Sequence, residues 1–163
     1  MRTHKLGFRI FPKGILMFKN ILVPTDGSAL SKKAIKAGIA FAKSTGARVT
    51  GFYSPEPYEI LAYGEYFPPD LMSRAEWDER SKKTAQKFLA VIEKEAKAAG
   101  VACSSLHLAR LAPWQAIVEA AKKKKCDLIF MASHGRTGLS GLLLGSQATK
   151  VATHSKIPVL IYR

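Results

Sequence analysis

A run of small residues follows a strongly apolar segment late in the chain. Residues 127–133 read DLIFMAS, which predicts a buried strand, and residues 132–146 then read ASHGRTGLSGLLLGS. Glycines let main-chain N–H groups come close to an anion. The run ends at Gly145-Ser146, where a helix over about 145–154 is expected to begin, and the unpaired N–H groups and positive dipole end of a helix suit a phosphate group. The pattern therefore predicts a phosphate-binding loop.

The glycines alone leave a second interpretation open, a tight turn before a capped helix. The loop has neither the Gly-Lys-Ser/Thr of a P-loop nor the GxGxxG of dinucleotide-binding proteins. His134-Gly135 is followed by Arg136-Thr137, so the second histidine of the HxGH pattern typical of nucleotidyltransferases is missing. Phosphoryl transfer needs positioned metal ligands and a group that orients the nucleophile. The sequence offers no such base, and we assign no catalytic residue.

The loop must be positioned by the elements around it, and strand and helix patterns alternate along the chain. Ser28 is a good N-cap, Gly46 and Gly100 are good helix stops, and Pro113 fits a first helical turn. Alternating strands and helices imply right-handed crossovers and a mostly parallel sheet with helices on both faces, an α/β fold. The predicted strands are 19–24, 47–54, 101–108, 127–133 and 157–162, and the predicted helices are about 29–45, 70–99, 112–125 and 145–154.

In such sheets ligands bind outside the carboxyl ends of the strands, where the strand order reverses. The loops after the first, second and fourth strands open at that edge. We therefore expect Thr25-Asp26, Ser54 and the 132–146 loop to be neighbours. Asp26 also fits a plain turn in which its carboxylate accepts a hydrogen bond from its own backbone. Residues 55–69 contain four prolines and predict a loop.

The bulk composition indicates one globular domain. The chain has 163 residues, of which 47% are hydrophobic and 23% charged. No apolar run reaches the roughly 20 residues of a membrane helix, so we expect no membrane contact. The two cysteines, Cys103 and Cys126, make neither a metal site nor a disulfide framework. We expect buried, reduced thiols and a cytoplasmic location.

The net charge of +14 calls for an explanation. Residues 1–16 carry four cations and no acid, so the remainder of the chain carries 14 − 4 = +10. This basic extension is either a flexible arm or not native, in which case Met17 is the natural start. Lys122 to Lys125 form the densest run, at a predicted helix end where cations favour the negative end of the helix dipole. We expect a solvated face there and not a nucleic-acid patch.

Three segments resemble the universal stress protein family. The ATP motif of that family is Gly, two residues, Gly, nine residues, then Gly-Ser or Gly-Thr. Here Ala132 and Gly135 are followed after nine residues by Gly145-Ser146. The opening ILVPTDGS (21–28) and the closing KIPVLIYR (156–163) are also similar to that family. The resemblance covers about 17–163, the predicted domain.

The resemblance implies a fold, a ligand and a partner. The fold would be a five-stranded parallel sheet sandwiched by helices, Rossmann-like and of the adenine nucleotide alpha hydrolase-like kind. The ligand would be ATP, or ADP or AMP, with Mg²⁺ held through the phosphates and Asp26 as its one candidate protein ligand. The last strand, 157–162, would pair with its twin in a homodimer. The residues that this resemblance assigns to the nucleotide are Pro24, Thr25, Asp26, Ser54, Met131, Ala132, Gly135, Gly145, Ser146 and Gln147, and Arg136 would screen phosphate or point to solvent.

One position departs from the family motif, because Ala132 replaces its first glycine. A positive φ at an alanine would cost about 1 kcal/mol or more, and its methyl group would crowd a ligand. We expect ATP binding to be weakened or unchanged. The function that the resemblance implies is nucleotide-dependent regulation in a stress response, through an unknown protein partner and with at most slow ATP hydrolysis. A nucleotide-free protein- or nucleic-acid-interaction module is the alternative, and a nucleotidyltransferase is a weaker one.

Overall fold

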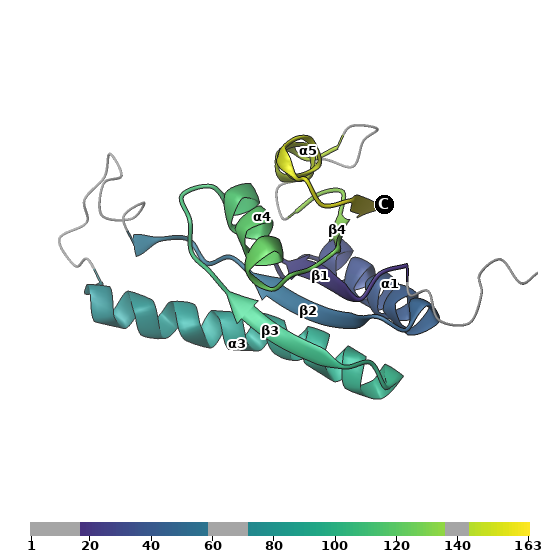
Figure 1. The fold of residues 1–163 in the computed structure, drawn as a ribbon. Helices are drawn as coiled ribbons and strands as arrows, with labels where there is room; N and C mark the ends of the chain where they lie inside the picture. The colour runs from purple at the N-terminus through teal and green to yellow at the C-terminus, as the bar shows by residue number, and fades with distance from the viewer. Residues whose placement is uncertain (1–16, 59–71, 136–143) are drawn as a thin grey trace, which may run out of the picture.

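The computed structural model describes residues 17–58, 72–135 and 144–163 and shows one parallel sheet between two helical layers (Figure 1). The five strands lie in the order β3-β2-β1-β4-β5, and every neighbouring pair is parallel. The predicted fold class is thereby confirmed. The strand order reverses between β1 and β4, which is the point where ligands bind in sheets of this kind.

The elements follow the predicted sequence of strands and helices. The strands are β1 (Asn20–Thr25), β2 (Arg48–Tyr53), β3 (Cys103–His107), β4 (Leu128–Ala132) and β5 (Val159–Tyr162), and the helices are α1 (Ala29–Thr45), α3 (Arg74–Ala99), α4 (Pro113–Lys123) and α5 (Ser146–His154). Most predicted bounds hold within two residues. None of these helices in the described ranges combines the length and the apolar character needed to cross a bilayer.

Alternating side chains of the strands build two cores on opposite faces of the sheet. Ile21 and Val23 pack with α1 and α3, whereas Leu22 between them packs with α4 and α5. On β4, Phe130 faces the first core and Met131 the second. The near-continuous apolar runs of the central strands therefore arise because both faces of the sheet are covered.

Local sequence signals fix the helix ends. The Ser28 hydroxyl accepts a hydrogen bond from Ser31 N–H at 3.1 Å, as expected for an N-cap. Gly46 and Gly100 end α1 and α3 with φ of 73° and 71°, values that favour glycine. The expected start of the long helix near residue 70 was wrong. It begins at Arg74, because Ser73 caps it and the Glu76 carboxylate accepts back from Ser73 N–H at 2.8 Å.

Candidate functional site

The turn after β1 and the loop after β4 meet at the carboxyl edge of the sheet. Asp26 Oδ1 accepts a hydrogen bond from Ser28 N–H at 3.0 Å, which folds the turn over the start of α1. A Cβ atom on Gly135 would lie 2.7 Å from Asp26 Oδ2. Only a glycine allows the β4 loop to approach this carboxylate so closely. The expected contact between these two segments is present.

The loop after β4 is closed by a main-chain hydrogen bond between its two ends. Gly145 N–H donates to the Ser133 carbonyl at 2.8 Å, and a Cβ on Gly145 would lie 2.9 Å from that same oxygen. Ser133 N–H in turn donates to the Tyr162 carbonyl at 2.7 Å. Sequence reasoning missed Ser133. It is almost fully buried, and its main chain ties the loop to the end of β5.

The hydrogen bond from Gly145 N–H to the Ser133 carbonyl changes the expected role of Gly145, because this N–H group already has an acceptor. The N–H groups of Ser146, Gln147 and Ala148 lie in the first turn of α5 and have no intrahelical acceptor. Across the ranges that the structure covers, they have no other protein acceptor either. Of these three residues Ser146 is exposed, Gln147 is half-buried and Ala148 is buried. The main-chain donors left without an acceptor at this edge are therefore at the helix start.

Gln147 has a structural role that its sequence position does not reveal. Its Oε1 accepts a hydrogen bond from Trp114 N–H at 3.0 Å, in the first turn of α4. Trp114 also stacks on His154, with ring centroids 4.5 Å apart. These contacts hold both ends of α5 against the first turn of α4. The side chain of Gln147 is thus directed to α4, and its main-chain N–H remains as its donor toward an anion.

The replacement of the first motif glycine by Ala132 causes no backbone strain. Ala132 is the last residue of β4, and Lys125 is the one non-glycine residue with a positive φ in the described chain. The methyl group of Ala132 lies in the core on the α1 and α3 side. Met131 packs into the opposite core. Both side chains are buried in the two cores, so what Met131 and Ala132 can offer a ligand is their main-chain groups.

The remaining predicted residues lie around the same edge. Thr25 is buried, and its hydroxyl accepts from Gly27 N–H at 3.1 Å. Pro24 pairs in register with Phe52 on β2. The Ser54 hydroxyl, just past the end of β2, is buried and has no hydrogen-bond partner within the residues placed here. A buried hydroxyl without a partner is costly, so this atom is a natural contact for a ligand. Arg136 lies outside the described residues.

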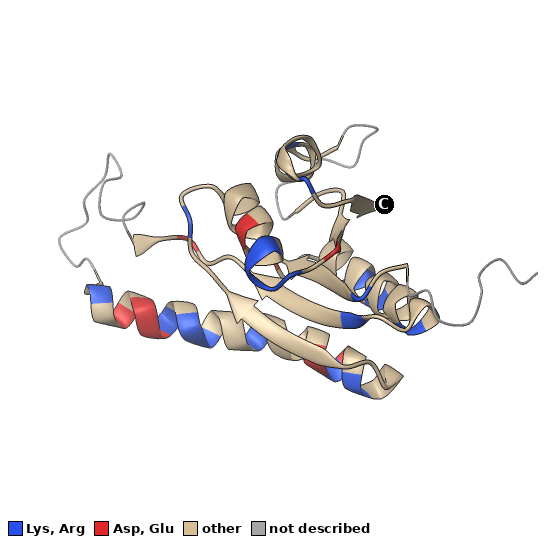
Figure 2. Cartoon of the chain, in the orientation of Figure 1, with Lys and Arg blue, Asp and Glu red and all other residues tan. Residues whose placement is uncertain are grey.

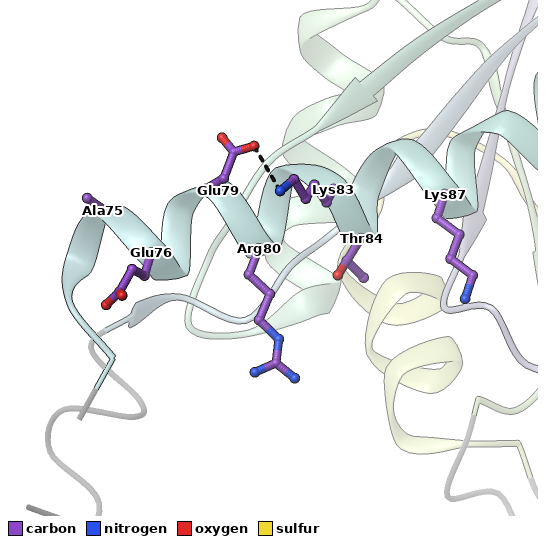
Figure 3. A pocket seen from close by; sticks show the side chains of 7 residues that line it. All are labelled: Ala75, Glu76, Glu79, Arg80, Lys83, Thr84 and Lys87. Atoms are coloured by element: carbon purple, nitrogen blue, oxygen red, sulfur yellow. Dashed lines mark ion pairs between the residues drawn. The ribbon is translucent and has the colours of Figure 1, made fainter. Parts of the chain in front are cut away.

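Two hollows on the surface lie apart from these residues. One runs along the exposed N-terminal half of α3 and is lined there by seven residues, among them Arg80, Lys83 and Lys87 (Figure 3). The other, of about 540 Å³, lies between α3, the segment after β2 and the segment after β3, with Trp77 and His107 among its lining residues. No predicted site residue lines either hollow.

Among the described residues, the titratable side chains beside the loop after β4 are Asp26 and His134. His134 Nδ1 lies 3.0 Å from the Ser133 hydroxyl, which orients the ring beside the loop. Burial raises the pKa of both thiols, Cys103 and Cys126, so they remain protonated near neutral pH. Cys103 is half-buried, less than expected, and Cys126 is buried as expected. The residues that can be placed contain no group of three or more potential metal ligands around Asp26 or elsewhere.

The fold and the site together define a class: a parallel α/β domain with main-chain donors at a helix start and a glycine contact at its switch point. The sequence profile of the universal stress protein family matches residues 17–163. The chain belongs to the universal stress protein family.

Relatives of known sequence and structure agree with this assignment. Universal stress protein MJ0531 of Methanocaldococcus jannaschii is 35% identical over 159 residues, covering 94% of this chain and 87% of its own. The solved structure of MJ0577, from the same organism, is 30% identical with a TM-score of 0.73, covering 89% of this chain and 95% of its own. A solved universal stress protein in complex with cAMP is 26% identical with a TM-score of 0.66, covering 90% of this chain and 97% of its own.

Proposed function

We propose that this chain binds ATP at the carboxyl edge of its sheet and acts as a nucleotide-dependent regulatory protein. The observation that carries the proposal is the start of α5, where three successive main-chain N–H groups have no acceptor among the described residues, beside the bond from Gly145 N–H to the Ser133 carbonyl. Such a helix start favours negative charge through its dipole and its unpaired donors. The phosphates would lie on Ser146 and on the N–H groups of Gln147 and Ala148.

The nucleoside would lie toward β1 and β2. Asp26 is held at the switch point by its bond from Ser28 N–H and by its approach to Gly135. A carboxylate so placed suits the hydroxyls of a ribose. The unpartnered Ser54 hydroxyl at the end of β2 suits a polar edge of adenine. The cAMP complex of a 26% identical relative supports an adenine nucleotide in this class of site.

Magnesium would accompany the phosphates and would not occupy a separate protein site. Asp26 is the one carboxylate among the predicted site residues, and Mg²⁺ is usually bound by one or two carboxylates together with substrate phosphates and water. What this chain supplies is positioning of the phosphate chain by main-chain donors. That arrangement supports binding, and it supports hydrolysis only weakly.

We also propose a homodimer formed through β5 and a cytoplasmic location. β5 is at the edge of the sheet and pairs with β4 alone among the described strands. All four of its residues are only partly buried in the single chain. An open apolar edge strand is a template for pairing with a second strand. The two free thiols fit a reducing compartment.

The experiment is titration calorimetry of nucleotide-free protein with ATP, using two variants of Ser146. Proline is tolerated at the first position of a helix, and Gly145 before it already has an extended conformation, with φ −63° and ψ 152°. Ser146→Pro therefore removes one N–H and the hydroxyl while the helix persists, and Ser146→Ala removes the hydroxyl alone. A charge-assisted hydrogen bond is worth about 1.5–3 kcal/mol, so Ser146→Pro should weaken ATP binding about tenfold or more.

Ser146→Ala should have the smaller effect of the two, and circular dichroism should show both variants folded. An absence of heat with ATP in the unsubstituted protein would refute the proposed function. Equal ATP affinity in Ser146→Pro and the unsubstituted protein would refute the assignment of the phosphates to α5.

A further inference from the structure

The amino edge of the sheet, opposite the proposed nucleotide site, gathers cations from three separate segments. Lys19 directly precedes β1, Arg48 is the first residue of β2, Lys122 and Lys123 end α4, and Lys124 and Lys125 form the turn that follows. Because β2, β1 and β4 are adjacent and parallel, their starting ends lie side by side. We call these six residues the basic edge. Figure 2 shows the blue turn at the end of α4.

Hydrogen bonds hold these segments together. Arg48 N–H donates to the Lys19 carbonyl at 3.1 Å, and Asn20 Nδ2 donates to the Lys124 carbonyl at 2.9 Å. Asp127 is the acid at their centre, and its two oxygens accept from Lys19 N–H at 2.8 Å and Asn20 N–H at 3.0 Å. Both oxygens of this carboxylate therefore accept from the backbone, and no ion pair joins it to a lysine side chain among the described residues.

The cations of the basic edge have no ionic partners in the described chain. The ion pairs found there are Arg74–Asp78, Lys83–Glu79 and Arg110–Glu119, none of which involves the basic edge. Five of the six side chains are exposed, and Lys124 is half-buried. The N-terminal half of α3, in contrast, alternates basic and acidic residues (Figure 2). A merely solvated surface would be expected to mix signs as α3 does, since like charges close together repel.

The backbone of this edge is also strained at a lysine. Lys125 has φ 52°, in the left-handed region, where the residue after a helix is usually glycine. An L-residue with a side chain bears a cost there that glycine avoids. Strain and unpaired charge at one place indicate a role outside folding.

We propose that the basic edge binds the phosphate backbone of nucleic acid without reading its sequence. Exposed lysines and an arginine that form no ion pair among the described residues are suited to neutralise nucleic-acid phosphates. None of the six residues is aromatic, so these residues offer no stacking platform for bases. A membrane surface fits less well, because peripheral binding also needs an apolar face, and of the described residues next to β1, β2 and β4 at this edge Met17 is the one large hydrophobic residue that is exposed. This proposal is independent of the nucleotide site.

The test is fluorescence anisotropy with a labelled duplex of mixed sequence, about 20 base pairs long, over about 50 to 200 mM salt. The first variant neutralises three cations as Lys122→Gln, Lys123→Gln and Lys125→Gln. The matched control neutralises three exposed lysines of α3, Lys82→Gln, Lys83→Gln and Lys87→Gln, so both variants lose equal net charge. A second variant, Lys19→Gln with Arg48→Gln, removes the two cations of the basic edge that lie beside β1 and at the start of β2.

The unsubstituted protein should bind with an affinity that falls steeply with salt. The first variant should bind about tenfold or more weakly, and its salt slope should fall by about 0.9 for each lost phosphate contact, about 2.7 for three. The second variant should also weaken binding, and the α3 control should change it little. Absence of duplex binding at the lowest salt, or equal weakening by the control, would overturn the proposal. Binding to phosphatidylserine vesicles in place of the duplex would overturn it in favour of a membrane surface.

Discussion

The two edges of the sheet each contain an aspartate at a strand end, and the two carboxylates are used differently. Asp127 at the amino edge accepts two main-chain N–H groups from a segment more than 100 residues away, so both of its oxygens join β1 to β4. Asp26 at the carboxyl edge accepts the N–H of Ser28, two residues on, and approaches Gly135 closely. The first carboxylate fixes the sheet, and the second is positioned at the switch point of the fold.

The backbone amides at the two edges differ in the same way. At the amino edge the N–H groups of Lys19, Asn20, Arg48 and Asp127 all have acceptors, and the charge of the side chains is what remains for a partner. At the carboxyl edge the donors that remain are main-chain groups at the start of α5. One edge therefore offers fixed dipoles for a small anion, and the other offers flexible cations for an extended polyanion.

The largest expected effect concerns the packing of the carboxyl edge. Gly27 has φ 81°, and a Cβ there would lie 2.4 Å from the ring of Phe88 on α3. Gly27→Ala should therefore lower the free energy of unfolding by about 2–4 kcal/mol, through strain and overpacking together. Gly100→Ala is the matched control, because Gly100 has φ 71° and nothing within 4 Å of its would-be Cβ. It should cost about 1 kcal/mol in urea unfolding. Equal losses of unfolding free energy in the two variants would show that the Phe88 ring moves aside without a measurable cost.

The second largest effect on stability is expected at the hydrogen bond by which Gln147 of α5 caps the first turn of α4. Gln147→Ala leaves Trp114 N–H without its acceptor, and loss of a helix cap costs about 1 kcal/mol. Gln147→Glu keeps an acceptor oxygen and should retain most of the stability. Gln115→Ala, at an exposed position of α4, serves as the control. If Gln147→Ala unfolded at the same urea concentration as the unsubstituted protein, the cap would carry no stability.

The smallest effect is a gain in the free energy of unfolding, and it is expected from a substitution at the amino edge. Lys125→Gly relieves a left-handed conformation worth about 1–2 kcal/mol, against a loss of about 0.5–1 kcal/mol from the greater chain entropy of glycine. A net gain of about 0.5 kcal/mol is expected in urea unfolding. Lys124→Gly, at φ −91°, should instead lower the stability. A loss of stability in Lys125→Gly would remove the strain argument for the basic edge.

Much of this architecture could be predicted from the sequence because it depends on local signals. Ser28, Gly46, Gly100 and Pro113 marked helix ends correctly, and the rule for parallel sheets correctly brought Asp26 and Gly135 together. The start of α3 was misplaced although the signal was present, since Ser73 and Glu76 form the spacing of a capping box.

The features that could not be predicted depend on contacts between distant segments. Gln147 and Trp114 are 33 residues apart, and nothing near either residue indicates their bond. The basic edge is similar, because only Lys122 to Lys125 are clustered in the sequence, and folding adds Lys19 and Arg48. Engagement of the Gly145 amide by Ser133 is a matter of loop geometry that composition does not determine.

The central claim, that nucleotide phosphates lie on the start of α5, is tested most directly by amide hydrogen exchange with and without ATP. Saturating ATP should slow exchange at Ser146, Gln147 and Ala148, whose N–H groups have no protein acceptor in the described chain. Exchange at Lys19 and Asn20, on the opposite edge, should be unchanged. Unaltered exchange at the start of α5 under conditions where ATP is bound would contradict the claim.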